Sequence, residues 1–323
     1  MSLVYCGARY IAPTGVAAIK TSPLSFLLGT ATTDTSSTAS TSTAVMNWFQ
    51  AAVLGVVQGL TEFLPISSTA HLKVVPVAMG WGDPGVAFTA VIQLGSIAAI
   101  LWYFWSDLTQ VTVGMVQAVM RSDYESRDFR MGLGIILGTI PILIGGVLIK
   151  VFIPDFDRSP LRSMAAIASA SIVMSLLLAA AEYVGKRKRT LEDVGTQDGI
   201  WMGLAQTLAL VPGVSRSGST LTAGLLIGLE RGAAARFSFL LGIPAITIAG
   251  LVELKTLLEV GIQGSELLPL AIGVITAAVS SYVAIAWLLR YLQTHNTWIF
   301  IWYRLGFGVA ILGAIAANLV QNV

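Results

Sequence analysis

Residues 58–71 read QGLTEFLPISSTAH and decide how this chain folds. The sequence on both sides is apolar enough to lie in a lipid bilayer, yet this stretch holds a carboxylate, an imidazole, two serines and two threonines. Ionisable groups at membrane depth are costly and by default mark a functional site. Pro65 interrupts helical hydrogen bonding in the middle of the stretch. The sequence therefore predicts two half-helices joined by a turn whose free backbone groups face a protected cavity.

The composition of the whole chain is that of a polytopic membrane protein. Of its 323 residues, 55% are hydrophobic and 11% are charged, and the mean hydropathy is +0.79, which excludes an ordinary soluble domain. The formal charge is +2 and the basic residues lie at predicted helix ends, so we expect no nucleic-acid partner. A single cysteine and two histidines argue against a disulfide framework and a closed zinc site, so any metal is expected to use oxygen ligands.

Residues 1–45 differ from the rest of the chain because a short apolar run is followed by a Ser/Thr tract at 30–43. Three interpretations are open: a targeting leader, a disordered extension, or an upstream start codon chosen in error. We favour the last two, because MNWFQAAVLG from Met46 would be an ordinary start for a membrane protein. Residues 46–323 are then expected to form a single integral-membrane domain.

Apolar stretches of two lengths follow along this domain. The longer ones are predicted to be full spans, at residues 86–105, 131–153, 161–184, 233–253, 267–289 and 298–320. Shorter apolar pieces at 48–60, 200–211 and 221–229 flank polar breaks. Residues 108–120 mix polar and apolar side chains over a length too short to cross, so we expect an interfacial helix there.

A second polar break, PGVSRSGST at residues 212–220, resembles the first break at residues 65–71. With an offset of 147 residues, Pro65 falls on Pro212 and Ser68 on Ser215. Three predicted spans separate the two breaks, so two hairpins that re-enter the membrane there must enter from opposite faces. The predicted fold is an all-α polytopic membrane protein with an inverted-topology repeat, in halves at about 46–153 and 161–289 plus a final helix at 298–320. Its two re-entrant helix hairpins are expected to meet near the membrane midplane.

The distribution of basic residues predicts the orientation of the chain. Cytoplasmic loops carry an excess of lysine and arginine. If the charged loop at 186–189 is cytoplasmic, ten basic residues lie on that side and four on the other. Both termini and the entrance of the first hairpin are then expected outside. The ten are Arg121, Arg127, Arg130, Lys186, Arg187, Lys188, Arg189, Arg231, Arg236 and Arg290, and the four are Lys150, Arg158, Arg162 and Lys255.

The first break carries the side chains of a catalytic site. Gln58 and Glu62 are four residues apart and share a helix face. Ser68 and His71 are three apart, which aligns them if the second half-helix begins near Ser67. The second half-helix begins with residues that are common at helix N-caps, so the free backbone N–H groups at its start are expected to bind an anion. These capping residues are Ser67, Ser68 and Thr69.

The second break supplies Arg216, a guanidinium among hydroxyl groups and flexible backbone. This is the chemistry of a phosphate clamp. The alternative is a salt bridge from Arg216 to Glu62 that joins the two repeats, and both roles can hold in turn. The hydroxyl groups that flank Arg216 are those of Ser215, Ser217, Ser219 and Thr220, and of these we expect Ser215, Ser217 and Thr220 to bind substrate.

Together these groups suit phosphoryl transfer, which depends on positioning and charge stabilisation. The chain has no nucleotide-binding signature, and a substrate with its own lipid tail explains a site inside the membrane. A transporter or lipid flippase is the alternative, because an inverted repeat alone favours it. The convergence of Glu62, Ser68, His71 and Arg216 in one pocket favours the enzyme.

The two polar breaks, QGLTEFLPISSTAH and PGVSRSGST, closely resemble the signature motifs of the bacterial undecaprenyl-diphosphate phosphatase family. This family is also known for bacitracin resistance. The resemblance runs from about Met46 to the last helix and includes VIQLGSIAAI and RFSFLLGIP. It implies hydrolysis of undecaprenyl diphosphate to undecaprenyl phosphate and inorganic phosphate, which recycles the lipid carrier of peptidoglycan synthesis. Position 58 is Gln where many members have Glu, which weakens a two-carboxylate metal site. Carried over by the motif, the catalytic residues are Glu62, Ser68, His71 and Arg216, and we expect Gln58, Ser67, Thr69, Ser215, Ser217 and Thr220 to bind substrate.

The resemblance also implies a divalent cation and a multi-pass protein of the bacterial inner membrane whose site opens towards the periplasm. We expect Mg²⁺ or Ca²⁺ to be held by Glu62 together with the substrate diphosphate. The expected partners are a polyprenyl diphosphate and membrane lipids, with a homodimer as an open alternative. Three routes are open for the nucleophile: Ser68 with His71 as its base, which we favour, His71 itself, or a water activated by Glu62.

Overall fold

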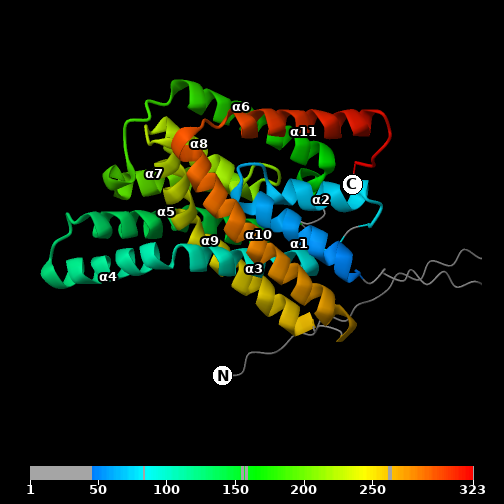
Figure 1. Cartoon of the computed structure of the whole chain (residues 1–323), viewed down its shortest axis with the longest axis horizontal. Coiled ribbons are helices and arrows are strands. Elements are labelled where there is room, and N and C mark those ends of the chain that lie inside the picture. Colours follow the sequence, from blue (N-terminus) through cyan, green and yellow to red (C-terminus); the bar gives the residue numbers. More distant parts are fainter. Residues whose placement is uncertain (1–45, 83, 154–155, 157–158, 261–263, 323) are drawn as a thin grey trace, which may run out of the picture. The chain divides into compact units, whose positions relative to one another are not determined.

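The computed structural model describes residues 46–82, 84–153, 156, 159–260 and 264–322, and the regular elements of these residues are helices (Figure 1). Residues 1–45, and with them the three interpretations of that segment, lie outside the described residues. The α-helices are α1 (Trp48–Phe63), α2 (Ser68–Ala78), α3 (Val86–Tyr103), α4 (Trp105–Arg121), α5 (Arg127–Phe152), α6 (Met164–Val184), α7 (Thr196–Gln206), α8 (Arg216–Leu226), α9 (Arg231–Val260), α10 (Leu267–Thr294) and α11 (Trp298–Ala316). Short 3-10 turns are η2 (Pro160–Arg162), η3 (Leu191–Asp193), η4 (Thr207–Leu210) and η5 (Gly264–Glu266).

Five of the described helices are long and apolar enough to cross a membrane, which confirms the multi-pass prediction. They are α5, α6, α9 over Arg231–Thr256, α10 and α11. The segment 86–105, which was predicted to be a full span, is not one of these five helices. Phe88–Tyr103 is long and apolar enough only together with Trp105–Arg121, and the two helices form a pair bent by 64°. The predicted stretch at 108–120 is the greater part of α4, the second member of this bent pair.

Local sequence signals explain where several helices begin. Asn47 and Gln50 form a capping box at the start of α1, with hydrogen bonds of 3.0 and 2.9 Å between each side chain and the other residue's backbone N–H. Ser163 caps α6 by accepting a hydrogen bond from Ala166 N. Ser215 caps α8 in the same way, so this helix begins at Arg216, earlier than the predicted piece at 221–229.

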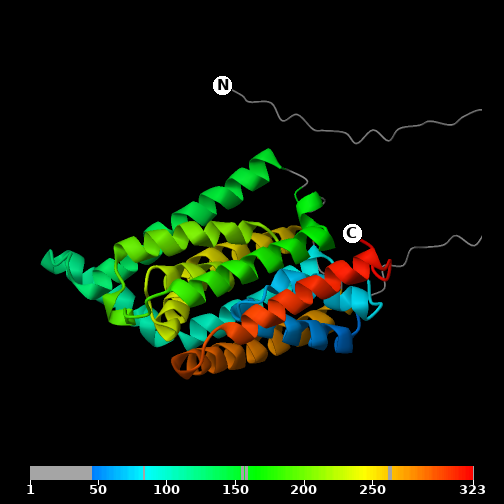
Figure 2. The same ribbon diagram turned by 90° about the horizontal axis from the view of Figure 1, so that it is seen from above.

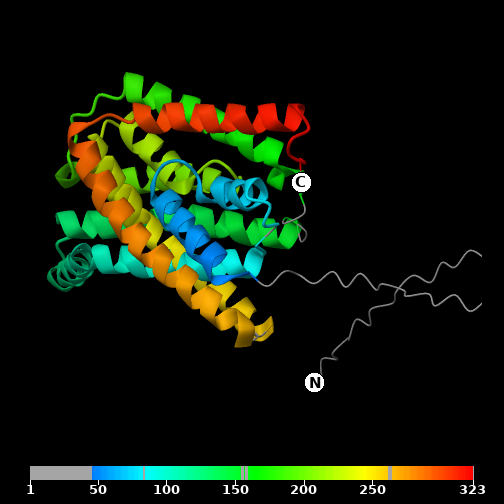
Figure 3. The ribbon, with the colours of Figure 1, turned by 45° about the vertical axis from the view of Figure 1, so that its right-hand side comes forward.

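Two helix pairs are packed backbone to backbone, and both include one helix next to a break. Along α1 and α10, a Cβ atom placed on Gly59 would lie 2.5 Å from Ala277 O. Between α7 and α5, a Cβ atom on Gly203 would lie 2.1 Å from Gly138 O. Small residues permit such close approach of membrane helices, and Figure 3 shows α1 running beside α10.

Of the three 11-residue helices α2, α7 and α8, the helices α2 and α8 begin within the two breaks, and α2 packs on α1 and α6. Helix α8 packs on α6, α7 and α9, and α6 runs beside α11 (Figure 2). Phe63, at the end of α1, packs edge-on against Phe239 of α9 with ring centroids 5.5 Å apart. Phe239 packs in turn on Phe104 at 6.0 Å. This aromatic group of α1, α9 and the bend between α3 and α4 supports the first break from within the helix bundle.

Candidate active site

The first and second breaks meet in the structure, and both contain a strained serine. Ser67 precedes α2 with φ of 75° and Ser215 precedes α8 with φ of 73°. Residues other than glycine seldom adopt positive φ, and such conformations persist where the surroundings impose them. The two breaks are joined directly, since Ser217 Oγ donates a hydrogen bond of 3.0 Å to Leu64 O.

Glu62 is the centre of the hydrogen-bond network at this junction. Its Oε2 accepts hydrogen bonds from Ser68 Oγ at 2.7 Å and from Gln58 Nε2 at 3.2 Å. Its Oε1 faces Nη2 of Arg216 at 3.3 Å. Both charged side chains are shielded, with 12% of Arg216 and 10% of Glu62 exposed. The structure therefore brings together four predicted residues, and the ion pair is the one anticipated as the alternative role of Arg216.

His71 lies outside this network, which differs from the expectation that it is the base for Ser68. Its Nδ1 is 2.8 Å from Ser67 O and its Nε2 is 2.7 Å from the hydroxyl of Tyr303. The hydrogen bond of Ser68 goes to Glu62 instead. The reason is geometric: the side chain of Ser68 points back to the end of α1, whereas the imidazole lies against α11.

The guanidinium of Arg216 occupies space that a glycine leaves free. A Cβ atom placed on Gly242 of α9 would lie 1.8 Å from Nη1 and 2.9 Å from Cζ of Arg216. No side chain larger than hydrogen fits at position 242 with the guanidinium in this place. Gly242 lies in RFSFLLGIP, one of the stretches that carried the resemblance.

The other residues predicted to bind substrate differ in their burial and in their hydrogen bonds. Ser215 Oγ accepts a hydrogen bond of 3.2 Å from Gly218 N and thus caps α8. Thr220 is buried and bonds to Arg216 O at 2.8 Å and to the hydroxyl of Ser238, so its contacts are within and beside α8. Ser67 stands at the cap position of α2 without a side-chain cap hydrogen bond, and Thr69 is exposed.

Arg304 of α11 is a residue of the junction that the sequence reasoning missed. Its side chain is fully buried and donates to Pro65 O at 3.0 Å, to Gly213 O and Val214 O at 2.9 Å, and to Ser171 O at 3.3 Å. One guanidinium thereby binds backbone carbonyl groups of both breaks. The available signal was an arginine inside the apolar stretch 298–320, because a cation in a span is expensive and usually functional.

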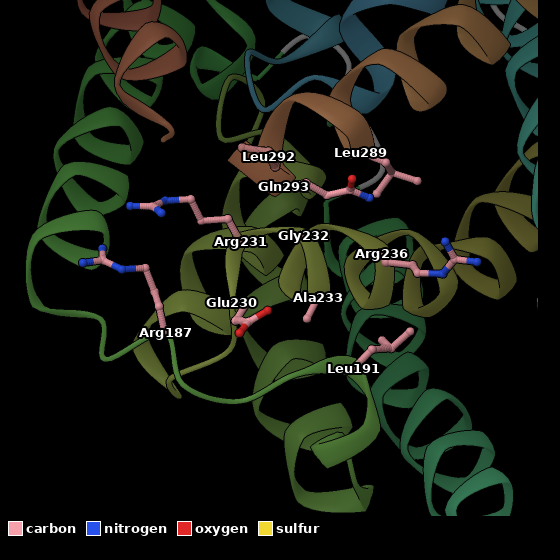
Figure 4. Close-up of a pocket in the computed structure, with 10 residues that line it drawn as sticks. All are labelled: Arg187, Leu191, Glu230, Arg231, Gly232, Ala233, Arg236, Leu289, Leu292 and Gln293. Atoms are coloured by element: carbon pink, nitrogen blue, oxygen red, sulfur yellow. The ribbon is translucent and has the colours of Figure 1, made fainter. Parts of the chain in front are cut away.

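A cavity lies elsewhere, where α9 begins and α10 ends. It measures about 500 Å³ and its lining includes Arg187, Arg231 and Arg236 (Figure 4). Arg187 and Arg231 extend together to one side, where both pair with Glu182, while Arg236 extends to the other and pairs with Asp107 at 2.7 Å. These guanidinium groups hold helices together, and none of the predicted catalytic residues lines the cavity.

Known proteins resemble this chain over a range that contains both breaks. The family described as Bacitracin resistance protein BacA matches residues 51–310, a range that includes both breaks and Arg304. The chain belongs to this family. An undecaprenyl-diphosphatase of Nostoc sp. is 68% identical over 277 residues, which are 86% of this chain and 87% of that protein. Proteins of the same name from Synechococcus elongatus and Synechocystis sp. are 68% identical over 278 residues (86% of this chain, 96% of the relative) and 64% identical over 270 residues (84% and 83%).

The BacA family resemblance expected from the sequence is therefore confirmed. The match begins at residue 51, within α1, and it ends within α11. It includes the bent pair of helices α3 and α4 and all five of the candidate spans in whole or in part.

Proposed function

We propose that this protein hydrolyses undecaprenyl diphosphate to undecaprenyl phosphate and inorganic phosphate, and thereby recycles the lipid carrier of peptidoglycan synthesis. The observation that carries the proposal is the junction of Glu62, Ser68 and Arg216, which unites a hydroxyl, its proton acceptor and a phosphate-binding cation. Relatives at 68% identity bear the name of this activity. Bacitracin resistance follows as the expected phenotype, in line with the family's description.

In the proposed reaction, Ser68 is the nucleophile and Glu62 is its base. The Ser68 hydroxyl already donates to Glu62 Oε2 at 2.7 Å, so the proton can pass to the carboxylate as the oxygen attacks the terminal phosphorus. An O–P bond to Ser68 forms, the anhydride P–O bond breaks and the lipid monophosphate leaves. Glu62 passes the proton of Ser68 to the departing lipid monophosphate and is again a carboxylate. Water then cleaves the phosphoserine: Glu62 takes one proton from the water and returns it to the Ser68 oxygen, and phosphate is released.

Arg216 and the start of α2 stabilise the charge of the transferred group in this proposal. The planar guanidinium can bind two phosphate oxygens, and in the free protein its charge is balanced by Glu62 at 3.3 Å. The side chain of Ser67 leaves the first N–H groups of α2 uncapped, so they can bind an anion. Arrival of substrate exchanges the Glu62 carboxylate for phosphate oxygens as the partner of Arg216.

The residues present fit a divalent cation bound together with the substrate. Magnesium and calcium take oxygen ligands, and magnesium is commonly held by one or two carboxylates and substrate phosphates. The carboxylate of Glu62 and the amide oxygen of Gln58 are the donors for such an ion. Among the described residues no group of three His, Cys, Asp or Glu side chains could hold a metal without substrate. When bound, the cation would neutralise charge on the diphosphate.

We further propose that the two breaks are the hairpins of an inverted-topology repeat. Helices α1 and α7 begin 148 residues apart, as do α2 and α8, and α2 and α8 each have 11 residues. Ser67 and Ser215, also 148 apart, share the same positive φ. The offset read from the sequence was 147, because it aligned the prolines rather than the strained serines. The repeat that relates α1 to α7 also relates the closely packed pair α1–α10 to the closely packed pair α7–α5. This correspondence supports a site at the interface of the two repeats.

The contacts of basic residues support the proposed orientation, with the charged loop in the cytoplasm and the site opening to the periplasm. Arg127 pairs with Glu192 at 2.9 Å, Arg189 with Asp198 at 2.7 Å, and Arg187 and Arg231 share Glu182. Residues assigned to one side by the positive-inside rule are thus joined at one end of the helices. The location in the inner membrane of a bacterium is proposed from the relationship to the bacterial family.

The test is phosphate release by the purified protein in detergent micelles, where transport across a membrane cannot occur. Undecaprenyl diphosphate labelled on the terminal phosphate should give free phosphate with wild-type protein and none with Glu62→Gln. Absence of release, together with movement of the lipid between leaflets of proteoliposomes, would assign the site to a flippase. Rapid quenching without acid should leave label on Ser68 that survives later acid treatment, whereas an acid-labile adduct would assign the attack to His71 and no adduct would assign it to water.

A further inference from the structure

The imidazole of His71 is held in a stack of aromatic rings. Tyr303 and Phe307 of α11 lie four residues apart and present both rings to it. The ring centroids are 5.6 Å and 4.3 Å from that of His71, with interplanar angles of 10° and 9°. His71 is 5% exposed, so α11 fixes the plane of its ring.

The hydrogen bonds of His71 define how the ring is protonated. Ser67 O, at 2.8 Å from Nδ1, is a carbonyl oxygen and can only accept, so Nδ1 carries a hydrogen. In the neutral ring Nε2 is then the acceptor, and the hydroxyl of Tyr303 at 2.7 Å donates to it. The basic atom of His71 is thus directed to Tyr303 and away from Ser68.

The carbonyl that His71 binds belongs to the strained residue of the first break. Ser67 has φ of 75°, and its peptide leads directly to Ser68, the nucleophile proposed above. A hydrogen bond from Nδ1 helps to hold this conformation, and the orientation of the imidazole depends on Tyr303. The chain of contacts runs from the Tyr303 hydroxyl through the His71 ring to the Ser67 carbonyl.

We propose that Tyr303 is a positioning residue for this reaction, which acts through His71 on the Ser67 backbone and so on the direction of the Ser68 hydroxyl. His71 has a positioning role in this arrangement, and Glu62 takes the proton of Ser68. The inference rests on the proposed function. In this proposal helix α11 contributes to the site in addition to the two breaks, which supply the reacting groups.

The first experiment compares Tyr303→Phe with Tyr282→Phe. Tyr303→Phe keeps the ring stack and removes one hydroxyl, so we expect kcat to fall roughly tenfold, the effect of one lost hydrogen bond, with KM little changed. The control, Tyr282 of α10, packs its ring on Tyr103 at 5.3 Å and has no hydrogen bond through its hydroxyl among the described residues. Equal kcat values in the two variants would overturn the proposal.

A second measurement reads the protonation of His71 without using activity. The chain has two histidines, so His295→Gln leaves one, and a tag without histidine keeps the spectrum simple. In the ¹⁵N-histidine spectrum of the full chain in micelles, we expect a protonated Nδ1 and a hydrogen-bonded Nε2 that becomes free in Tyr303→Phe. An Nε2-protonated ring, or no change in Tyr303→Phe, would refute the arrangement whether or not the protein proves to be a phosphatase.

The third comparison separates positioning from base catalysis at His71. The amide nitrogen of His71→Asn can donate to Ser67 O as Nδ1 does, but asparagine is no base, and His71→Leu can do neither. We expect the asparagine variant to retain at least tenfold more turnover than the leucine variant. Equal loss in both folded variants would show that the basicity of His71 is required and that its role is not positioning.

Discussion

Gly242→Ala is expected to inactivate the protein by moving one guanidinium. The added Cβ atom would lie 1.8 Å from Nη1 of Arg216. An ordinary contact needs 3.4 Å or more, so the head group must move by about 1.6 Å. That displacement breaks the 3.3 Å contact of Arg216 with Glu62 and shifts the proposed phosphate clamp. A misplacement of about 1 Å in a catalytic site can reduce the rate roughly a hundredfold, or about 2.7 kcal/mol of transition-state stabilisation.

The stability of this variant should change little, because the clash is with the far end of a flexible side chain and alanine favours a helix over glycine by about 0.5–1 kcal/mol. Phosphate release gives kcat/KM, and thermal unfolding in the same detergent gives the stability. The matched control is Gly146→Ala in α5, where a Cβ atom meets nothing within 4 Å. Wild-type kcat/KM in Gly242→Ala would refute the reasoning, since the guanidinium would then function from a different position.

Four further tests follow, three of them on the site and one on a buried amide of α7. Arg216→Lys keeps the charge but loses the planar fork, so phosphate release should fall at least about a hundredfold in a folded protein. EDTA should abolish activity, and calorimetry without substrate should detect no tight metal binding, because the described residues place no group of three His, Cys, Asp or Glu side chains around Glu62. Arg304→Met leaves four buried carbonyl groups without their donor and should cost about 4 kcal/mol or more in unfolding free energy. Gln206→Met removes a fully buried amide that has no partner among the described residues, so the melting temperature should rise.

The sequence was sufficient to find the two breaks because their signal is local. A proline and a group of polar side chains inside apolar sequence leave few other structures in a membrane. The same reasoning anticipated that Glu62 and Arg216 could pair, since opposite charges at membrane depth are driven together. The positions of five spans followed from the length of their apolar runs.

The sequence was insufficient where a residue's partner lies far along the chain. Spacing placed Ser68 and His71 on one helix face and suggested a serine–histidine pair, but side-chain direction depends on neighbours from other helices. The partner of His71 is Tyr303, 232 residues away. The length of α8 was misjudged for a different reason, because hydroxyl-rich residues in PGVSRSGST suggested a loop, whereas Ser215 caps a helix that includes them.

Arg304 shows why the site needs a helix that contains neither break. Each break leaves carbonyl oxygens without helical partners, among them those of the buried residues Pro65, Gly213 and Val214. The guanidinium binds Pro65 O from one break and Gly213 O and Val214 O from the other. A planar group of five donors can serve acceptors on both sides at once, which lysine cannot do. Arg304 therefore joins the turn that follows Glu62 to the turn that precedes Arg216, in addition to the ion pair between those two residues. Because the same helix carries Tyr303, α11 contacts both the turn that precedes Ser68, the proposed nucleophile, and the turn that precedes Arg216.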